Sequence, residues 1–394
     1  MLNSADELAL QRLVAVIPEW SGIGAAGKLT DCGANVLLHA GPAFHNAAAI
    51  TKPIFNSACV AAVYEGLARD FSEAGAKIKS GDVVLEPAQD HRVVTPLASV
   101  VSRSMPLQLV RDRHQSDHAV YSPLNGGGGP AMRLGLCNNA VLEHLRWLNG
   151  EFADALGEEL PESIALTPIA RDSLKEGDDC HGRTIAATRI LAERLNRLYK
   201  LSPRAQEFLA NGPSFFLNLW MAASKCMLAA SAGIEGSSLI ITAGANGART
   251  GIQIAGLPEQ WFVHEAAAPT GKLDDSTLPQ SRALGAIGDS AIIDALGLGA
   301  MAMNYAPEQQ KNLLQFMPAG GLALPQALLS AVHTGFGELN LKVGTLARTV
   351  VDNGRQPVVS LGMLDIEGEL GRLGGGIYSP PLSIFSDAVS ALQG

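Results

Sequence analysis

Residues 214–233, SFFLNLWMAASKCMLAASAG, constrain the fold of this chain more than any other segment. They are apolar on nearly every face of a helix, which is typical of a helix buried at the centre of a domain. Asn218 and Lys225 stand two helical turns apart and so share one face. Because burying an isolated charge is very costly, Lys225 must be paired or face a polar cavity. We expect both side chains to face a pocket where Lys225 neutralises an anion; a lysine that simply reaches the surface is the alternative.

An α/β unit is expected over residues 34–112. ANVLLHAGPAF reads as a strand ending at Gly-Pro, and residues 47–76 carry apolar side chains at helical spacing. GDVVLEPAQDH reads as a strand and loop, and MPLQLVRD as another short strand. Ligand groups gather on the loops that follow such strands, which here are residues 41–45 and 87–96.

The rest of the chain has a helical sequence pattern first and a strand-like pattern after it. Helical spacing recurs over 141–156 and 188–198, whereas from Gly236 onward glycine separates the strand-like runs SLIITAG, TGIQIAG and QWFVHEA. A small-residue helix is expected over 288–304. We predict a mixed α/β fold with an N-terminal Rossmann-like α/β unit (1–130), a central helical region (131–235) and a C-terminal Gly-rich α+β region (236–394).

Composition excludes several classes of partner and site. The formal charge is −9 and no basic run occurs, which argues against nucleic acid and anionic membranes. The start lacks the pattern of a signal peptide, and no stretch of roughly 18 uncharged apolar residues is present, so we expect a cytoplasmic protein. Five cysteines without a CxxC pair favour reduced thiols over a disulfide framework or a zinc knuckle, and we predict no metal.

The segment EPAQDHRVVTP places Asp90 beside His91 next to a strand end. A carboxylate can orient an imidazole, and histidine titrates near neutral pH, which suits proton transfer. Sequence neighbours often point apart, however, so a pair of unrelated surface residues is the alternative. We take His91 as a catalytic candidate and Asp90 as a substrate-binding one.

The run EGDDCHGRT packs five functional residues into six positions before a helix: Asp178, Asp179, Cys180, His181 and Arg183. A helix cap explains one aspartate. Polar clusters beside a helix N-terminus bind anions, and on that ground we predict Asp179 and His181 as catalytic and Arg183 as anion-binding. A metal site lacks a second ligand motif, and adjacency to His181 does not by itself activate Cys180.

Three further residues are candidates for substrate or anion binding. Asn246 and Arg249 in GANGART follow a strand, and Asp289 in IGDSA is either a helix cap or a ligand residue. The tetraglycine at 126–129 matches neither GxGxxG nor GxxxxGK, so it indicates either a linker or a ligand loop.

Several of these segments together resemble a bacterial domain family typified by YlbE and YahG. They are AGPAF, EPAQDHRVVTPLASVVSRSMP, EGDDCHGRTIAAT, FFLNLWMAASK, GANGARTG, GDSAIIDALGLGAMAM and QPVVSLG. Thr95, Leu97 and Gly182 stand where the family pattern has Gly, Met and Asn. Those departures bear on the substrate more than on the fold.

The resemblance implies an oxamate carbamoyltransferase built from several different subunits in ureide nitrogen metabolism. That reaction interconverts oxalurate plus phosphate with oxamate plus carbamoyl phosphate, without a further cofactor. The cations Arg183, Lys225 and Arg249 suit the phosphate, and His91 or His181 suits the amide proton. Two alternatives stay open: an amidohydrolase or lyase acting on a related small amide, and a non-catalytic subunit that completes a partner's site. In each case we expect a small anionic amide or ureide ligand and a homo- or hetero-oligomer.

Overall fold

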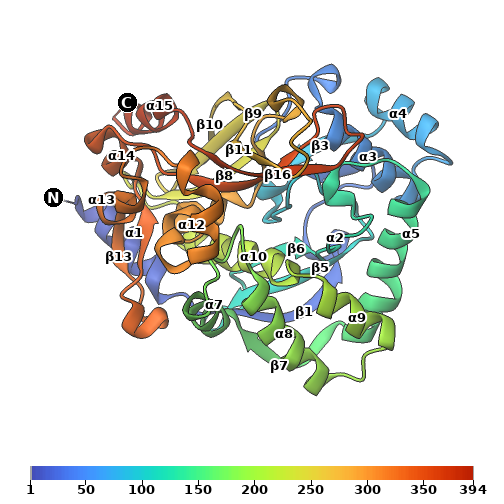
Figure 1. The fold of residues 1–394 in the computed structure, drawn as a ribbon, viewed down its shortest axis with the longest axis horizontal. Coiled ribbons are helices and arrows are strands. Elements are labelled where there is room, and N and C mark those ends of the chain that lie inside the picture. Colours follow the sequence, from blue (N-terminus) through green and yellow to red (C-terminus); the bar gives the residue numbers. More distant parts are fainter. Residues whose placement is uncertain (1, 394) are drawn as a thin grey trace.

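The computed structural model describes residues 2–393 and has the mixed α/β class predicted from the sequence (Figure 1). In the N-terminal unit, β2 (Val36–His39) pairs in parallel with β3 (Val84–Pro87) and antiparallel with β4 (Val100–Val101). Two helices, α3 (Lys52–Glu65) and α4 (Phe71–Ser80), connect β2 to β3. The expected single helix over 47–76 is wrong, because Gly66 ends α3 in a left-handed conformation and Asp70 starts α4 by accepting a bond from Glu73 N.

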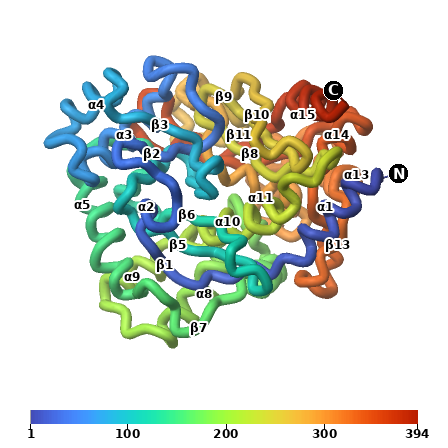
Figure 2. Tube along the Cα trace, turned by 180° about the vertical axis from the view of Figure 1, so that it is seen from behind, coloured from blue at the N-terminus to red at the C-terminus, as the bar shows by residue number. Residues whose placement is uncertain are grey.

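A second, antiparallel sheet has the order β6-β5-β1-β7. Its strands are β1 (Pro18–Ala25), β5 (Pro106–Asp112), β6 (Ala119–Pro123) and β7 (Glu159–Ala165). The predicted strand MPLQLVRD is β5. Before β1 comes α1 (Ser4–Ala15), which lies against β13 (Leu329–Val332), as the view from behind shows (Figure 2).

The helices of the middle third surround one buried helix. They are α5 (Asn139–Trp147), α6 (Ala153–Leu156), α7 (Leu166–Lys175), α8 (Ile185–Leu198), α9 (Pro203–Asn211) and α10 (Phe215–Ala229). Every residue from Phe215 to Leu228 in α10 is buried, as predicted. On one side α10 packs on β5 and β6, and on another it packs on β8 and α11. This central position puts its polar residues between the N- and C-terminal parts of the chain (Figure 1).

Within the described residues, the C-terminal third contributes two larger sheets and a two-stranded one, in which β13 pairs with β14 (Lys342–Thr345). One of the larger sheets has the order β10-β9-β8-β12, with β8 (Ile240–Asn246), β9 (Arg249–Ile254) and β10 (Leu257–Glu265) at the predicted runs and β12 (Ile287–Gly288) beside β8. The other consists of β11 (Thr270–Leu273), β16 (Arg372–Tyr378) and β15 (Val359–Leu364). The helix expected over 288–304 is shorter: α11 (Ala291–Leu296) is followed by a 3-10 segment, Gly299–Tyr305.

The remaining elements lie around these sheets: α2 (Ala26–Leu29), α12 (Pro307–Leu313), α13 (Leu324–Leu328), α14 (Ala347–Asn353) and α15 (Leu382–Ala391). The largest core cluster includes Trp20, Trp220 and Phe385 and so draws on all three predicted regions. The division at 130 and 235 stays a prediction. Within residues 2–393, the helices are all too short or too polar to cross a bilayer.

Candidate functional site

Lys225 on α10 is a buried cation without a carboxylate partner. Its side chain is 5% exposed, and Nζ donates to Ile241 O at 3.0 Å and to the Thr242 hydroxyl. Among the described residues no carboxylate forms an ion pair with it, so one N–H of the ammonium group remains for a ligand. Burial lowers the pKa of Lys225 to about 8, although the more distant Asp289 and Asp90 charges favour the protonated form.

This lysine lines a cleft of about 530 Å³, within the range of small-molecule sites. Residues of η2 (Ala88–His91), the start of β6, α10, β8 and β9 form its walls. Its lining carries two cations, Arg92 and Lys225, and three carboxylates, Asp90, Asp117 and Glu259. The other polar residues of the lining are Gln89, His118, Thr242 and Gln253. The α/β loop over 87–96, expected to hold ligand groups, therefore contributes to this cleft.

A chain of hydrogen bonds connects Asp90 to Lys225 across the cleft. Asp90 Oδ1 accepts from Gln253 Nε2 at 3.2 Å and from Trp261 Nε1 at 2.8 Å. Gln253 Oε1 in turn accepts the Thr242 hydroxyl proton at 2.6 Å, and Thr242 accepts from Lys225. Neutral groups thus hold a carboxylate and an ammonium apart in one cleft. A ligand with an anionic end and an N–H donor end would complement both.

Asp289 fixes the loops that border this region. Its carboxylate is fully buried and accepts from Gly41 N at 2.9 Å, Gln89 Nε2 at 2.8 Å, and Thr95 N and Oγ1 at 2.9 and 3.1 Å. Burial raises the pKa of Asp289 to about 6, while these donors oppose the rise. A Cβ at Gly244 would lie 2.5 Å from Asp289 Oδ1, so glycine is required there. The Asp289 side chain thus binds the loops that follow β2 and β3, and it does not cap α11.

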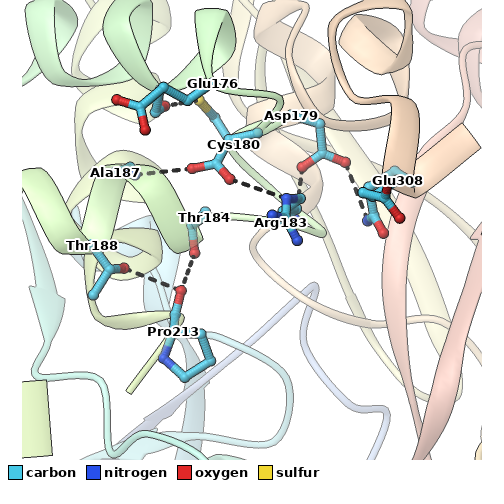
Figure 3. A network of polar contacts seen from close by, with 12 residues as sticks. Glu176, Asp179, Cys180, Arg183, Thr184, Ala187, Thr188, Pro213 and Glu308 are labelled. Carbon is cyan, nitrogen blue, oxygen red and sulfur yellow. Dashed lines mark hydrogen bonds and ion pairs between the residues drawn. The ribbon is translucent and has the colours of Figure 1, made fainter. Parts of the chain in front are cut away.

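The loop before α8 is a closed network of its own (Figure 3). Asp178 Oδ2 accepts from Ala187 N at 2.9 Å, and Oδ1 lies 3.5 Å from Arg183 Nε. Burial raises the pKa of Asp178 to about 6. Asp179 Oδ1 accepts from the backbone N–H groups of His181 and Arg183, both at 2.8 Å. The aspartates therefore shape this turn, and Asp178 provides the expected cap.

Cys180 lies inside this network and is not placed as a nucleophile. It is fully buried in a left-handed conformation (φ 65°), and Sγ lies 3.4 Å from Ser173 Oγ. Burial raises the pKa of the thiol well above its usual range, which opposes formation of the thiolate.

His181 is paired with a carboxylate that no local pattern revealed. Nδ1 lies 2.5 Å from Asp294 Oδ2, and Asp294 Oδ1 accepts from Ala300 N at 2.7 Å and Ser360 N at 3.2 Å. Burial opposes ionisation of the imidazole, but the Asp294 and Asp179 carboxylates outweigh it and raise the pKa of His181. Within residues 2–393, Nε2 forms no hydrogen bond. A carboxylate-oriented imidazole with one free nitrogen is suited to proton transfer.

His91 points away from its neighbour Asp90. Nδ1 lies 2.5 Å from Asp31 Oδ1 and Nε2 lies 2.8 Å from Glu86 Oε2, so carboxylates occupy both ring nitrogens. The two residues therefore belong to different networks. His91 is not among the residues that line the Lys225 cleft.

The other predicted residues hold the scaffold together. Asn218 Oδ1 accepts from Asn125 Nδ2 at 2.8 Å, so Asn218 serves the loop after β6 even though it shares a helix face with Lys225. Asn246 donates to Pro42 O at 2.7 Å and accepts from Arg249 N at 2.8 Å. The Arg249 side chain forms no ion pair with the described residues.

The segments predicted to carry site residues include 90–91, 178–183 and 218–225. The first and the last line the same cleft, through Asp90 and Lys225, whereas no residue of 178–183 lines it. Gln253 and Asp294 were not predicted from the sequence. Each is a lone polar residue in an apolar run, IQI and IIDAL, so the pattern that indicates Lys225 also indicates them. Among the described residues, no three His, Cys, Asp or Glu side chains are grouped as metal ligands.

Comparison with known proteins places the chain in a family. Residues 83–290 match the family model of oxamate carbamoyltransferase subunit AllG. The chain is 30% identical to the Escherichia coli K12 protein of that name, over 98% of this chain and 97% of that one. It is 27% identical to Escherichia coli YahG, an uncharacterised protein, over 98% of this chain and 85% of YahG. A crystal structure of a conserved Enterococcus faecalis V583 protein of unknown function superposes with a TM-score of 0.91 at 26% identity, covering 99% of this chain and 97% of that one. This chain therefore belongs to the AllG family, which also confirms the predicted relationship to YahG.

Proposed function

We propose that this protein is a subunit of an oxamate-type carbamoyltransferase, and that its Lys225 cleft binds the small anionic amide. Family membership supports the association with that enzyme. The observation that carries the proposal is the unpaired ammonium group of Lys225 in the same cleft as Asp90. An oxamate-like ligand has a carboxylate for the first and amide N–H groups for the second.

The transfer would proceed at the amide nitrogen of oxamate. This nitrogen attacks the carbonyl carbon of carbamoyl phosphate; the new C–N bond forms as the C–O bond to phosphate breaks, phosphate leaves with the electron pair, and one amide proton passes to a base. Lys225 would hold the carboxylate of oxamate, and Arg92, exposed in the same cleft, would face the phosphate. Asp90 would orient the amide through its N–H group. No cofactor is required. The catalytic roles predicted for His91, Asp179 and His181 stay predictions.

The test uses the chain assembled with its candidate partner subunits. Phosphate release from carbamoyl phosphate and oxamate is measured for the wild type, K225M and K28M. Lys28 is exposed on α2, and its one ion pair with residues 2–393 is to the exposed Glu158, so K28M is the matched control. We expect K225M to lower kcat/KM about 100-fold, the usual effect of losing a preorganised charge donor, and K28M to leave it unchanged. Full activity of K225M would contradict the proposal.

The same assembly separates the remaining functions. Oxalurate cleavage that needs phosphate supports transfer, whereas cleavage that proceeds without phosphate supports an amidohydrolase. If both K225M and D90N retain full transfer in the assembled enzyme, the chain acts as a non-catalytic subunit.

A further inference from the structure

Arg133 is a second cation without a counter-charge, in a different part of the molecule. It lies in the short turn Met132–Leu134, and its guanidinium donates twice to Gly127 O, from Nε at 3.3 Å and from NH2 at 2.8 Å. Among residues 2–393 no carboxylate forms an ion pair with it. Burial lowers the pKa of Arg133 to about 10, and the nearby positive charge of Arg372 adds to this effect. A charge held in this way is stabilised by an anion from solution.

The cavity beside Arg133 has a mainly apolar lining with five polar side chains and no carboxylate. Its polar lining includes Ser99, Asn125, Arg133, His144 and Asn149, and none of its lining residues is Asp or Glu. Asn149 Nδ2 is buried and has no hydrogen-bond partner, although the Asn149 amide lies near enough to the Tyr64 hydroxyl to oppose the rise of the Tyr64 pKa that burial causes. An unsatisfied donor and an unpaired guanidinium thus meet at one cavity, which calls for an acceptor that carries negative charge.

The size of the cavity limits what enters it. Its volume is about 20 Å³, enough for one or two ligand oxygens. Gly126 and His144 also line a surface depression of about 270 Å³. The tetraglycine of 126–129 forms one wall of it, and residues of α5 and α9, with the charged residues Arg204 and Glu207 among them, form the other. A ligand with a small charged head and a short body fits the two spaces together.

The tetraglycine loop is fixed at its start and open at its end. Asn125 Oδ1 accepts from Gly127 N at 2.9 Å, and Asn125 is itself held by Asn218 at 2.8 Å. At Gly128 and Gly129 an added Cβ would meet nothing within 4 Å, and neither residue has a left-handed φ. Neither packing nor backbone conformation therefore requires glycine at these two positions. Their small size leaves the entrance of the depression clear.

We infer that the cavity at Arg133 and Asn149 is a binding site for the oxyanion head of a small ligand, a carboxylate or a phosphate. The site is separate from the Lys225 cleft and does not depend on the proposed function. It gives roles to two features that the cleft does not use: the tetraglycine borders the entrance, and Asn218 supports the loop.

Binding of inorganic phosphate and of oxamate, measured by calorimetry at constant ionic strength, tests this inference. The measurement is made in the K225M background so that the cleft does not contribute. We expect saturable binding of at least one of the two, weakened ten-fold or more by R133M and less by R133K. The exposed Arg69 provides the control R69M, which should bind like the parent. Binding of phosphate alone identifies a phosphate site, and binding of oxamate alone identifies a carboxylate site.

A second variant keeps the inference testable if R133M does not fold. N149D places a carboxylate in the cavity of Arg133, so it should supply the missing counter-charge. We expect N149D to raise the melting temperature in the absence of added anion and to abolish binding of both probes. Absence of binding in the parent, or unchanged binding in R133M or N149D, would overturn the inference.

Discussion

His181 and Asp294, 113 positions apart in the sequence, are joined through Nδ1 and Oδ2 at 2.5 Å. Asp294 is fixed from its other oxygen by backbone N–H groups of Ala300 and Ser360. The carboxylate therefore sets the orientation of the imidazole and its Nδ1 proton and leaves Nε2 for another partner. A substitution of Asp294 therefore tests how His181 is oriented and protonated.

Replacing Asp294 by Asn should lower the pKa of His181 and destabilise the protein. The amide keeps the shape of the side chain but removes the charge that offsets burial of the imidazole, at a cost of about 3–5 kcal/mol. NMR titration of the imidazole and denaturant unfolding measure the two effects. D172N, at an exposed aspartate paired with Arg171, is the control. An unchanged His181 pKa in D294N would show that the pair does not hold the proton as described.

The same pair predicts how stability depends on pH. Because the folded pKa of His181 is raised, its contribution is fully present below the unfolded value of about 6.5 and is lost as pH rises through the folded value. The free energy of unfolding, measured from pH 5 upward, should decline in this window for the wild type. Subtracting the curve of H181Q should isolate the decline; parallel curves would contradict it.

Gly244, beside Asp289, and Gly128, in the tetraglycine loop, should respond to substitution according to the space at each Cβ. G244A places a methyl group 2.5 Å from Asp289 Oδ1 and 2.9 Å from Gln89 Nε2, so we expect a large loss of stability. G128A meets open space at a permitted φ and should be neutral or stabilise by up to about 1 kcal/mol through the unfolded chain. Thermal unfolding compares the two. Equal effects would mean that Asp289 is not held as tightly as the four bonds to it indicate.

Cys180 should be inert toward alkylating reagents in the folded protein. Its thiol is fully buried with a pKa held well above the usual range, whereas Cys137 is partly exposed and its pKa is lowered, chiefly by a hydrogen bond from Cys59. Mass spectrometry after brief iodoacetamide treatment should find Cys137 labelled and Cys180 unmodified. Labelling of Cys180 before Cys137 would reopen a nucleophilic role.

The sequence predicted the elements that local spacing determines, and it did not predict contacts between segments that are far apart in the chain. The buried helix α10 and strands β8 to β10 were predictable because local apolar spacing determines them. The pairing of β1 with β7 and the bond from Asp294 to His181 join distant segments, and nothing in a local pattern specifies them. Asn218 and Lys225 share a helix face, yet one contacts the loop after β6 and the other contacts β8. The helical spacing therefore predicted that both residues lie on one face of α10, but it did not predict which elements pack against that face.

The pH dependence of ligand binding reports directly on Lys225. Burial lowers its pKa to about 8, so the ammonium form that binds an anion is lost as pH rises through that value. Oxamate affinity at the cleft should fall above pH 8 in the wild type. K225R should keep binding at higher pH, because arginine stays charged. Identical profiles for the two proteins would assign the anion to another group.

A crystal of the protein soaked with oxamate shows which site holds the amide. We predict density in the Lys225 cleft, with the oxamate carboxylate within hydrogen-bonding distance of Lys225 Nζ and the amide nitrogen facing Asp90. Occupancy of the Arg133 cavity alone, with the Lys225 cleft empty at saturating oxamate, would contradict the account of the cleft as the amide-binding site.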